Sequence, residues 1–234
     1  MIQYLNPYIE LCIEGSSSIF KGLQQKDKEI IAQNHTLVII KKGGYLFKEG
    51  EKPRGLICLV SGKAKVFRVG VGDRQQIVKV VKQQGFIGYR AIYSDSLWTF
   101  SAIALEDSAI CILDRNSLIK LIKRNADLGL KFIKIISEEL WFSNNRIVSL
   151  TQKHVRGRLA ESLLIFRDTY GFEADGITLR VSLPREDIAN LSSMTTSNCI
   201  RTLSTMASEG IIEIQGKKIR IIENTKLEHI SELG

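Results

Sequence analysis

The chain has 234 residues, of which 44% are hydrophobic and 25% are charged, as is usual for a globular protein with its own core. No apolar run approaches the roughly 20 residues that span a bilayer, and residues 1–20 lack a basic region followed by an apolar stretch. The net charge of +8 lies in residues 1–149, because residues 150–234 carry 11 basic and 11 acidic side chains, so charge alone does not locate a polyanion-binding surface.

Residues 36–113 have the pattern of a domain built from short strands. Apolar, β-branched runs occur at 37–40, 56–60 and 77–81, and glycine-containing turns follow them. Several short strands punctuated by glycine favour a β-barrel or a sandwich. We therefore expect residues 1–115 to form an N-terminal β domain.

From about Asn116 the periodicity changes to that of a helix. Six residues follow one another at alternating spacings of three and four, the seam of a coiled coil: Ile133, Ile136, Leu140, Ser143, Ile147 and Leu150. Other apolar residues lie off this seam, so the helix needs cover on more than one side. We expect residues 116–152 to form a dimerisation helix and hinge, with a buried helix of a monomer as the alternative.

The remaining residues, 153–234, predict a separate helical domain. A helix is expected over 154–170 and a strand over 177–183. Pro184 suits the first position of a new helix, because a helix makes no use of the N–H that proline lacks there.

The segment from Arg185 to Glu209 has the layout of a helix-turn-helix, two short helices around a tight turn at 192–194. Thr195 is a good N-cap for the second helix, and Gly210 suits its C-terminal end. The expected core residues are Ile188 and Leu191 on the first helix, Met194 in the turn, and Cys199, Ile200, Leu203 and Met206 on the second.

The start of the second helix carries hydrogen-bonding side chains and no acid, which suits contact with base edges in the major groove of double-stranded DNA. After it, two short strands flank Gln215-Gly216 and predict a wing whose lysines reach phosphate. The candidate DNA-binding residues are Thr195, Thr196, Ser197, Asn198 and Arg201 on the helix, with Lys217 and Lys218 on the wing.

Together these features resemble the Crp/Fnr family of bacterial transcription regulators over nearly the whole chain. The similar segments are 47–51, 59–64, 85–88, 155–159, 185–189, 201–203 and 209–212. The resemblance implies an α+β protein with a double-stranded, jelly-roll-like β-roll, a long dimerisation helix and a C-terminal winged helix-turn-helix. It also implies a homodimer that binds a two-fold symmetric operator and contacts RNA polymerase.

The chain departs from the members of this family that bind cyclic nucleotides. Those members hold the phosphate with a Gly-Glu pair and a later arginine, whereas here Tyr89 follows Gly88 and residues 98–102 contain no arginine. Arginine usually binds phosphate through two charge-assisted hydrogen bonds, so we expect no binding of cyclic AMP or cyclic GMP here. An unidentified small-molecule effector is expected between the roll and the long helix, near Gly88, Tyr89, Arg90, Ser101, Ser143 and Asn144.

The sequence gives little support for an iron–sulfur cluster or a haem. The iron–sulfur members need an N-terminal cysteine cluster, and only Cys12 lies there; haem needs an axial ligand, and His35 is the only histidine before the long helix. We therefore assign neither metal nor cofactor. The four scattered cysteines form no paired motif, which predicts reduced thiols and a cytoplasmic protein.

On the DNA side, Thr196-Ser197 replaces the Arg-Glu pair of many members, whereas Arg201 matches the family arginine. The operator is therefore expected to differ from the common one.

Two other functions compete with DNA-binding regulation. A metal-dependent cupin enzyme would need clustered histidines, but His35, His154 and His229 are far apart in the sequence. A cyclic-nucleotide-binding regulatory subunit that acts on a protein partner would need the phosphate-binding residues and no recognition helix. We therefore expect a regulator and not an enzyme; the effector and the direction of regulation stay open.

Overall fold

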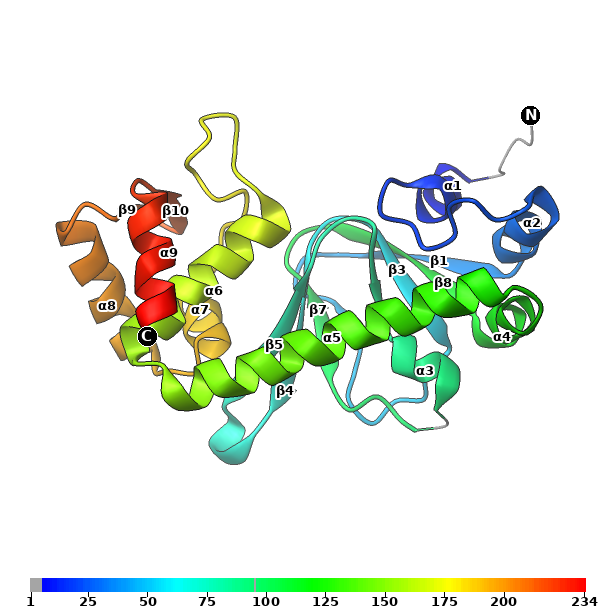
Figure 1. Ribbon diagram of the computed structural model, residues 1–234, viewed down its shortest axis with the longest axis horizontal. Helices are drawn as coiled ribbons and strands as arrows, with labels where there is room; N and C mark the ends of the chain where they lie inside the picture. Colours follow the sequence, from blue (N-terminus) through cyan, green and yellow to red (C-terminus); the bar gives the residue numbers. More distant parts are fainter. Residues whose placement is uncertain (1–5, 95) are drawn as a thin grey trace. The chain divides into compact units, whose positions relative to one another are not determined.

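The structure is a computed structural model that describes residues 6–94 and 96–234. The chain is an α+β protein and divides into two compact units. The first comprises Met1–Arg68 and Lys79–Leu140, and the second comprises Val69–Val78 and Trp141–Gly234. Figure 1 shows the strands of the β-roll and, in the second unit, the group of helices with its small hairpin.

Two antiparallel four-stranded sheets make up the β-roll, with strand orders β1-β8-β3-β6 and β2-β7-β4-β5. Two helices that the sequence did not predict precede it, α1 (Pro7–Glu14) and α2 (Gln25–Gln33). The strands are β1 (His35–Ile40), β2 (Tyr45–Phe47), β3 (Gly55–Ser61), β4 (Ala64–Val69), β5 (Gln75–Val81), β6 (Gly85–Ile87), β7 (Ser101–Ala104) and β8 (Ser108–Asp114), with a short 3-10 turn, η1 (Val71–Asp73), between β4 and β5.

Strand β3 contributes side chains to two apolar clusters, one on each side of its sheet. Its side chains alternate between the two sides of the sheet, as in any strand. Cys58 and Leu56 pack with residues of α1 and other helices, whereas Ile57 and Leu59 pack in the interior of the roll. A strand covered on both sides needs apolar residues at every position, and the sequence shows such a run.

Three further helices complete the first unit or begin in it: α3 (Tyr89–Tyr93), α4 (Arg115–Arg124) and α5 (Ala126–Gln152). The side chain of Asp114 caps α4 by accepting from the amide of Ser117 at 2.8 Å. The predicted segment 116–152 is not one helix: α4 ends at the C-cap Asn125, and α5 is continuous only from Ala126 to Gln152. Phe132, near the start of α5, is buried in the same apolar cluster as Leu56 and Cys58 of β3.

The second unit contains α6 (Val155–Tyr170), α7 (Arg185–Leu191), α8 (Thr196–Ser208) and α9 (Asn224–Leu233), together with the hairpin of β9 (Ile212–Gln215) and β10 (Lys218–Ile221). Helix α6 packs along α9, and α7 packs against α8 (Figure 1). Leu159, Leu163 and Phe166 of α6 are buried, as their helical spacing predicts.

Two predictions about this unit were wrong. Residues 177–183 form no strand but only isolated bridges, Phe172 with Leu179 and Thr178 with Arg220. The cause is Asp175, whose carboxylate accepts from the amides that follow it and holds the backbone in a turn. Pro184, which was predicted to be the first residue of a helix, is instead the N-cap of α7, and the helix begins one residue later at Arg185.

Within the part of the chain that the structure describes, no helix combines the length and the apolarity that crossing a bilayer requires.

Candidate nucleic-acid interface

The predicted helix-turn-helix is present as α7, a turn and α8. The turn over 192–194 contains Ser193 in the left-handed region, with φ 51°, and buries Met194 between the helices. Thr195 caps α8, because its hydroxyl accepts from the amide of Asn198 at 3.2 Å. Gly210 follows α8 with φ 71°, a conformation that glycine adopts at low cost.

The core side of α8 differs from the prediction at one residue. Cys199, Leu203 and Met206 are buried at helical spacing, whereas Ile200 is 48% exposed. A spacing of four and three residues along a helix already fills one face, so the neighbouring position turns away from the core. The prediction of a buried Ile200 was therefore wrong, and an apolar side chain stands on the open face of α8.

That open face also carries Thr196, Ser197 and Arg201, all of them exposed, and no acidic residue lies in the first turn of α8. Asn198 is half-buried, and the guanidinium of Arg201 donates to its side-chain oxygen at 2.7 Å. This hydrogen bond holds the two side chains in a defined relative orientation. Polar groups at the positively polarised start of a helix suit an anionic, hydrogen-bonding partner such as DNA.

The predicted wing is the β9–β10 hairpin, and Gly216 forms its turn with φ 59°. Lys217 is exposed at the tip. The ammonium of Lys218 lies 3.5 Å from the carboxylate of Glu173, so this lysine has a partner within the chain. Arg185, the first residue of α7, donates to the carbonyl of Gly216 at 2.6 Å and ties the wing to the helix-turn-helix.

A charged group of residues lies beside the wing: Glu173, Asp175, Thr178, Gln215, Lys218 and Arg220 line one small surface pocket. Within it, the carboxylate of Asp175 accepts from the hydroxyl of Thr178 at 2.5 Å and from two backbone amides. These hydrogen bonds lower the pKa of Asp175 to about 2. The pocket is thus held by its own hydrogen bonds and ion pairs.

The predicted effector residues divide between the two units. Gly88, Tyr89 and Arg90 lie together where β6 meets α3, and Ser101 begins β7, all in the first unit. Ser143 and Asn144 are exposed on α5 and belong to the second unit.

Aromatic packing surrounds the residues at the β6–α3 junction. Gly88 has φ 93°, and a Cβ atom there would clash with the indole of Trp98. The Trp98 ring in turn stacks on Phe47, with centroids 4.0 Å apart. Buried Tyr89 packs edge-on against Phe132 of α5 at 6.0 Å, and burial raises the pKa of its phenol.

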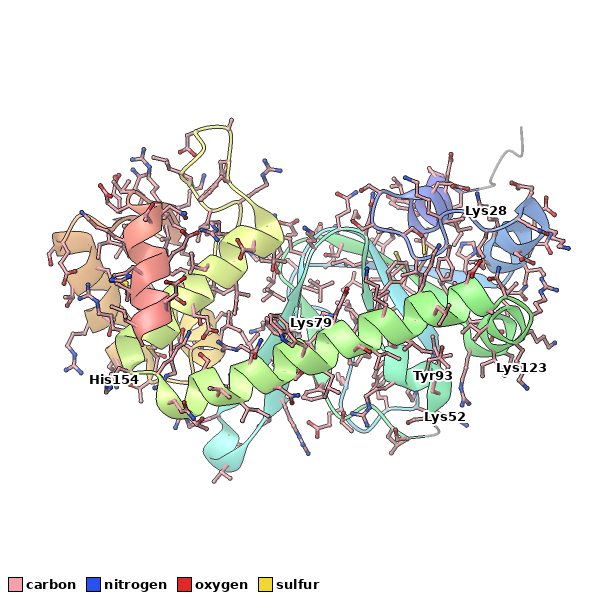
Figure 2. All side chains as sticks on the ribbon, in the orientation of Figure 1. Lys28, Lys52, Lys79, Tyr93, Lys123 and His154 are labelled. Carbon is pink, nitrogen blue, oxygen red and sulfur yellow. The ribbon has the colours of Figure 1, made fainter. Side chains whose placement is uncertain are left out.

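Charged groups also flank this junction. The ammonium of Lys79, labelled in Figure 2, lies 5.9 Å from the centroid of the Tyr89 ring and pairs with Glu139 of α5. Arg90 donates to the hydroxyl of Thr99 at 3.2 Å.

The predicted dimer seam has an exposed part and a covered end. Ile133, Leu140 and Ile147 repeat every seven residues and are 61%, 60% and 61% exposed. Ile136 and Ser143 are also exposed, whereas Leu150 is half-buried. Helix α5 thus presents apolar side chains to solvent along most of the seam.

Three cysteines that are scattered in the sequence meet in the core of the first unit. Cys58 of β3 is paired in register with Cys111 of β8, and the Cys12 thiol of α1 forms a hydrogen bond with Cys58. Burial raises the pKa of Cys12 and of Cys111, the latter to about 12. Residues 6–94 and 96–234 contain no group of three His, Cys, Asp or Glu side chains placed to hold a metal ion.

Both units match known protein families. Residues 37–125 match the cyclic nucleotide-binding domain, and residues 157–230 match the Crp-like helix-turn-helix domain. The chain is 25% identical over 217 residues to a CRP-like cAMP-activated global transcriptional regulator of Mycobacterium tuberculosis, covering 92% of this chain and 96% of the relative. It is 28% identical over 191 residues to the electron transport regulator A of Shewanella oneidensis, covering 80% of this chain and 75% of the relative.

The fold is shared with solved structures of similar regulators. A transcriptional regulator of the CRP/FNR family from Thermus thermophilus superimposes with a TM-score of 0.70 at 21% identity. The match covers 84% of this chain and 98% of that one. Regulators of this family bind DNA and act as dimers. Two matching domains in the same order, with relatives that span nearly the whole chain, identify it as a DNA-binding transcription regulator that belongs to the Crp/Fnr family.

Proposed function

We propose that this regulator binds a two-fold symmetric operator as a homodimer, with α8 in the major groove and the wing against the phosphate backbone. The observation that carries the proposal is the open, acid-free face at the start of α8. In helix-turn-helix proteins the first residues of the second helix contact base edges, and the residues exposed there have the chemistry for such contacts.

Each side chain on this face suits a different base feature. Asn198 can bind adenine through two hydrogen bonds, and Arg201 can bind guanine in the same bidentate way. Thr196 and Ser197 offer hydroxyls to either kind of base. We add Ile200 to the residues predicted from the sequence, because an exposed apolar side chain suits the methyl group of thymine.

The wing and the cap of α8 supply contacts that do not depend on base sequence. Lys217 is free to approach phosphate, and Thr195 lies at the helix start, where backbone amides favour an anion. Lys218 would exchange its ion pair with Glu173 for a phosphate, so it contributes less than Lys217. Such contacts position a protein on DNA without reading its sequence.

Dimerisation through residues 116–152 would cover the apolar side chains that α5 exposes, and it would present two copies of α8 to the two half-sites. This part of the proposal rests on the seam through Ile133, Leu140 and Ile147. We further propose that the dimer acts in the cytoplasm and contacts RNA polymerase, as a regulator of transcription must act where its DNA and its polymerase are.

The effector is proposed to lie at the β6–α3 junction, near Gly88, Tyr89, Arg90 and Ser101. The Mycobacterium tuberculosis relative is cAMP-activated, but we propose that this chain is not. Tyr89 is buried among aromatic rings in place of the usual acid, and the Trp98 ring closes over Gly88. Calorimetric titration with cyclic AMP should show no heat of binding; micromolar or tighter binding would contradict this.

Selection from random-sequence DNA tests the DNA-binding proposal. The protein should enrich an inverted repeat, and it should bind the enriched operator about 1,000-fold or more tightly than scrambled DNA at physiological salt. No enrichment, or equal affinity for both DNAs, would overturn the proposal. A regulatory subunit acting on a protein partner would give that negative result.

A further inference from the structure

Arg146, on the part of α5 that belongs to the second unit, is a buried cation that lies outside the predicted dimer seam and the predicted DNA-binding residues. Its residue is only 8% exposed. An isolated charge removed from water is costly, so such a group is retained with partners that hydrogen-bond to it. The partners of Arg146 are a carboxylate and a backbone carbonyl on two different helices.

The carbonyl belongs to Leu191, the last residue of α7. The Nη2 atom of Arg146 donates to it at 2.6 Å, and the Nε2 atom of Gln76 lies 3.4 Å from the same oxygen. The last carbonyls of a helix have no donor within the helix, and the negative end of the helix dipole favours a cation. Arg146 therefore caps the first helix of the helix-turn-helix from outside.

The carboxylate belongs to Glu161 of α6. The Nη1 atom of Arg146 donates to its Oε2 at 2.9 Å. Ser149, three residues further along α5, donates to the same oxygen, and the ammonium of Lys153 lies 3.8 Å from Oε1. Glu161 thus neutralises Arg146 and fixes the guanidinium where it reaches Leu191.

One planar guanidinium consequently joins α5, α6 and the end of α7. Leu191 lies just before the turn over 192–194, and Thr195, the N-cap of α8, follows that turn at once. A shift of the end of α7 would shift the start of α8. A lysine at this position would not reproduce these contacts, because its single ammonium nitrogen lacks the planar guanidinium that donates to the Glu161 carboxylate and the Leu191 carbonyl in fixed directions.

We propose that Arg146 is a positioning residue for DNA recognition: it fixes the recognition helix α8 on the C-terminal part of the dimerisation helix α5. The inference rests on the proposed function, since it assumes that α5 dimerises and α8 binds DNA. In a dimer, the separation of the two α8 helices depends on how firmly each is held on its own α5. Arg146 therefore governs which half-site spacing the dimer accepts.

This role has a signature that a purely structural role lacks. Loss of the guanidinium leaves the residues that contact bases and phosphates in place, so base preference within a half-site and the salt dependence stay as in the wild type. The affinity for the complete operator falls, because the two α8 helices of the dimer are no longer held at the separation of the two half-sites. The dependence of affinity on half-site spacing becomes flatter for the same reason.

The test compares the wild type with Arg146→Met and Arg146→Lys on the selected operator and on versions lengthened or shortened by one and two base pairs. Lys123→Met is the matched control, because it removes an exposed cation from α4 in the other unit. Arg146→Met should lose on the order of 10-fold in operator affinity, a typical coupling between two sites, and should discriminate less between spacings. Arg146→Lys should lose less, and the control should match the wild type.

Wild-type affinity and wild-type spacing dependence in Arg146→Met would overturn the inference. So would an equal loss on all DNAs, scrambled DNA included, because that marks damage to the whole DNA-binding unit. If Arg146→Met does not fold, the double variant Arg146→Met/Glu161→Gln removes both charges together, and Arg146→Lys keeps the charge; either carries the same test. A wild type without a preferred operator would contradict the proposed function instead.

Discussion

The side chains of Asn198 and Arg201 are joined by a hydrogen bond, which the guanidinium of Arg201 donates to the side-chain oxygen of Asn198 at 2.7 Å. Replacing either residue by Ala should cost about 1–3 kcal/mol of binding free energy on the operator and relax the preference at one base position.

Lys217→Ala should lower the affinity for all DNA sequences alike, and it should reduce the slope of log affinity against log salt concentration by about 1. Binding titrations over a salt series, on operator and scrambled DNA, separate the two effects. Altered base preference in the lysine variant alone would show that the roles are assigned wrongly.

Asp175 should make the second unit sensitive to acid. Hydrogen bonds from Thr178 and from backbone amides stabilise its carboxylate and lower its pKa from 3.8 to about 2. A lowered pKa in the folded state contributes stability that is present above the unfolded value, and it is lost as pH falls toward 2. Asp175→Asn should therefore melt at a lower temperature than the wild type near neutral pH, with a gap that narrows between about pH 4 and pH 2.

Melting curves over this pH range check that prediction. Glu232→Gln, which removes an exposed carboxylate from α9, controls for the change in charge. A gap between Asp175→Asn and the wild type that is constant from pH 5 to pH 2 would show that the hydrogen bonds of Asp175 do not favour its charged form.

Single residues were predictable from the sequence where their role is local. Thr195 caps α8 because a hydroxyl before a helix can bond its third amide, and no distant contact is needed for that. Arg146 was missed because its partners, Glu161 and Leu191, lie 15 and 45 residues away in the sequence. Ile200 was predicted to be buried because it is hydrophobic. Its burial depends instead on the face of α8 on which it lies, and that face is exposed.

At the scale of elements, α5 gives the clearest prediction. Its seam leaves Leu140 and Ile136 exposed in the single chain, and burying such side chains against a partner helix is favourable. Ile136→Lys combined with Leu140→Lys places charges in the seam and should yield monomers by analytical ultracentrifugation. Asn145→Lys adds an exposed charge to the same helix and should stay dimeric. A double variant that remains dimeric would rule out this seam.

Elements with a clear helical period or an apolar run between turns were predicted well, whereas α3 and the segment 177–183 were not. The three-four spacing located α5, and runs of apolar residues located β3 and β5 within one or two residues. Helix α3 has only five residues, too few for a helical period to appear. The strand expected at 177–183 failed because the turn held by Asp175 competes with pairing along its length.

At the scale of the whole molecule, the two units carry different parts of the function. The first contains the roll that matches the cyclic nucleotide-binding domain, and the second contains the helix-turn-helix that matches its Crp-like counterpart. The order of domains was predictable, because strand, long-helix and winged-helix patterns follow one another in the sequence. The aromatic surroundings of Tyr89 were not, because Phe132 of α5, 43 residues further along the chain, reaches it only through the fold.

The central claim is that two copies of α8 read one symmetric operator. The most direct measurement is the stoichiometry and affinity of the protein on the selected operator and on a single half-site, combined with footprinting. We predict two chains on each operator, protected half-sites centred about 34 Å apart or a multiple of that distance, and much weaker binding to the half-site. One chain on each operator, or equal affinity for the half-site, would contradict the account.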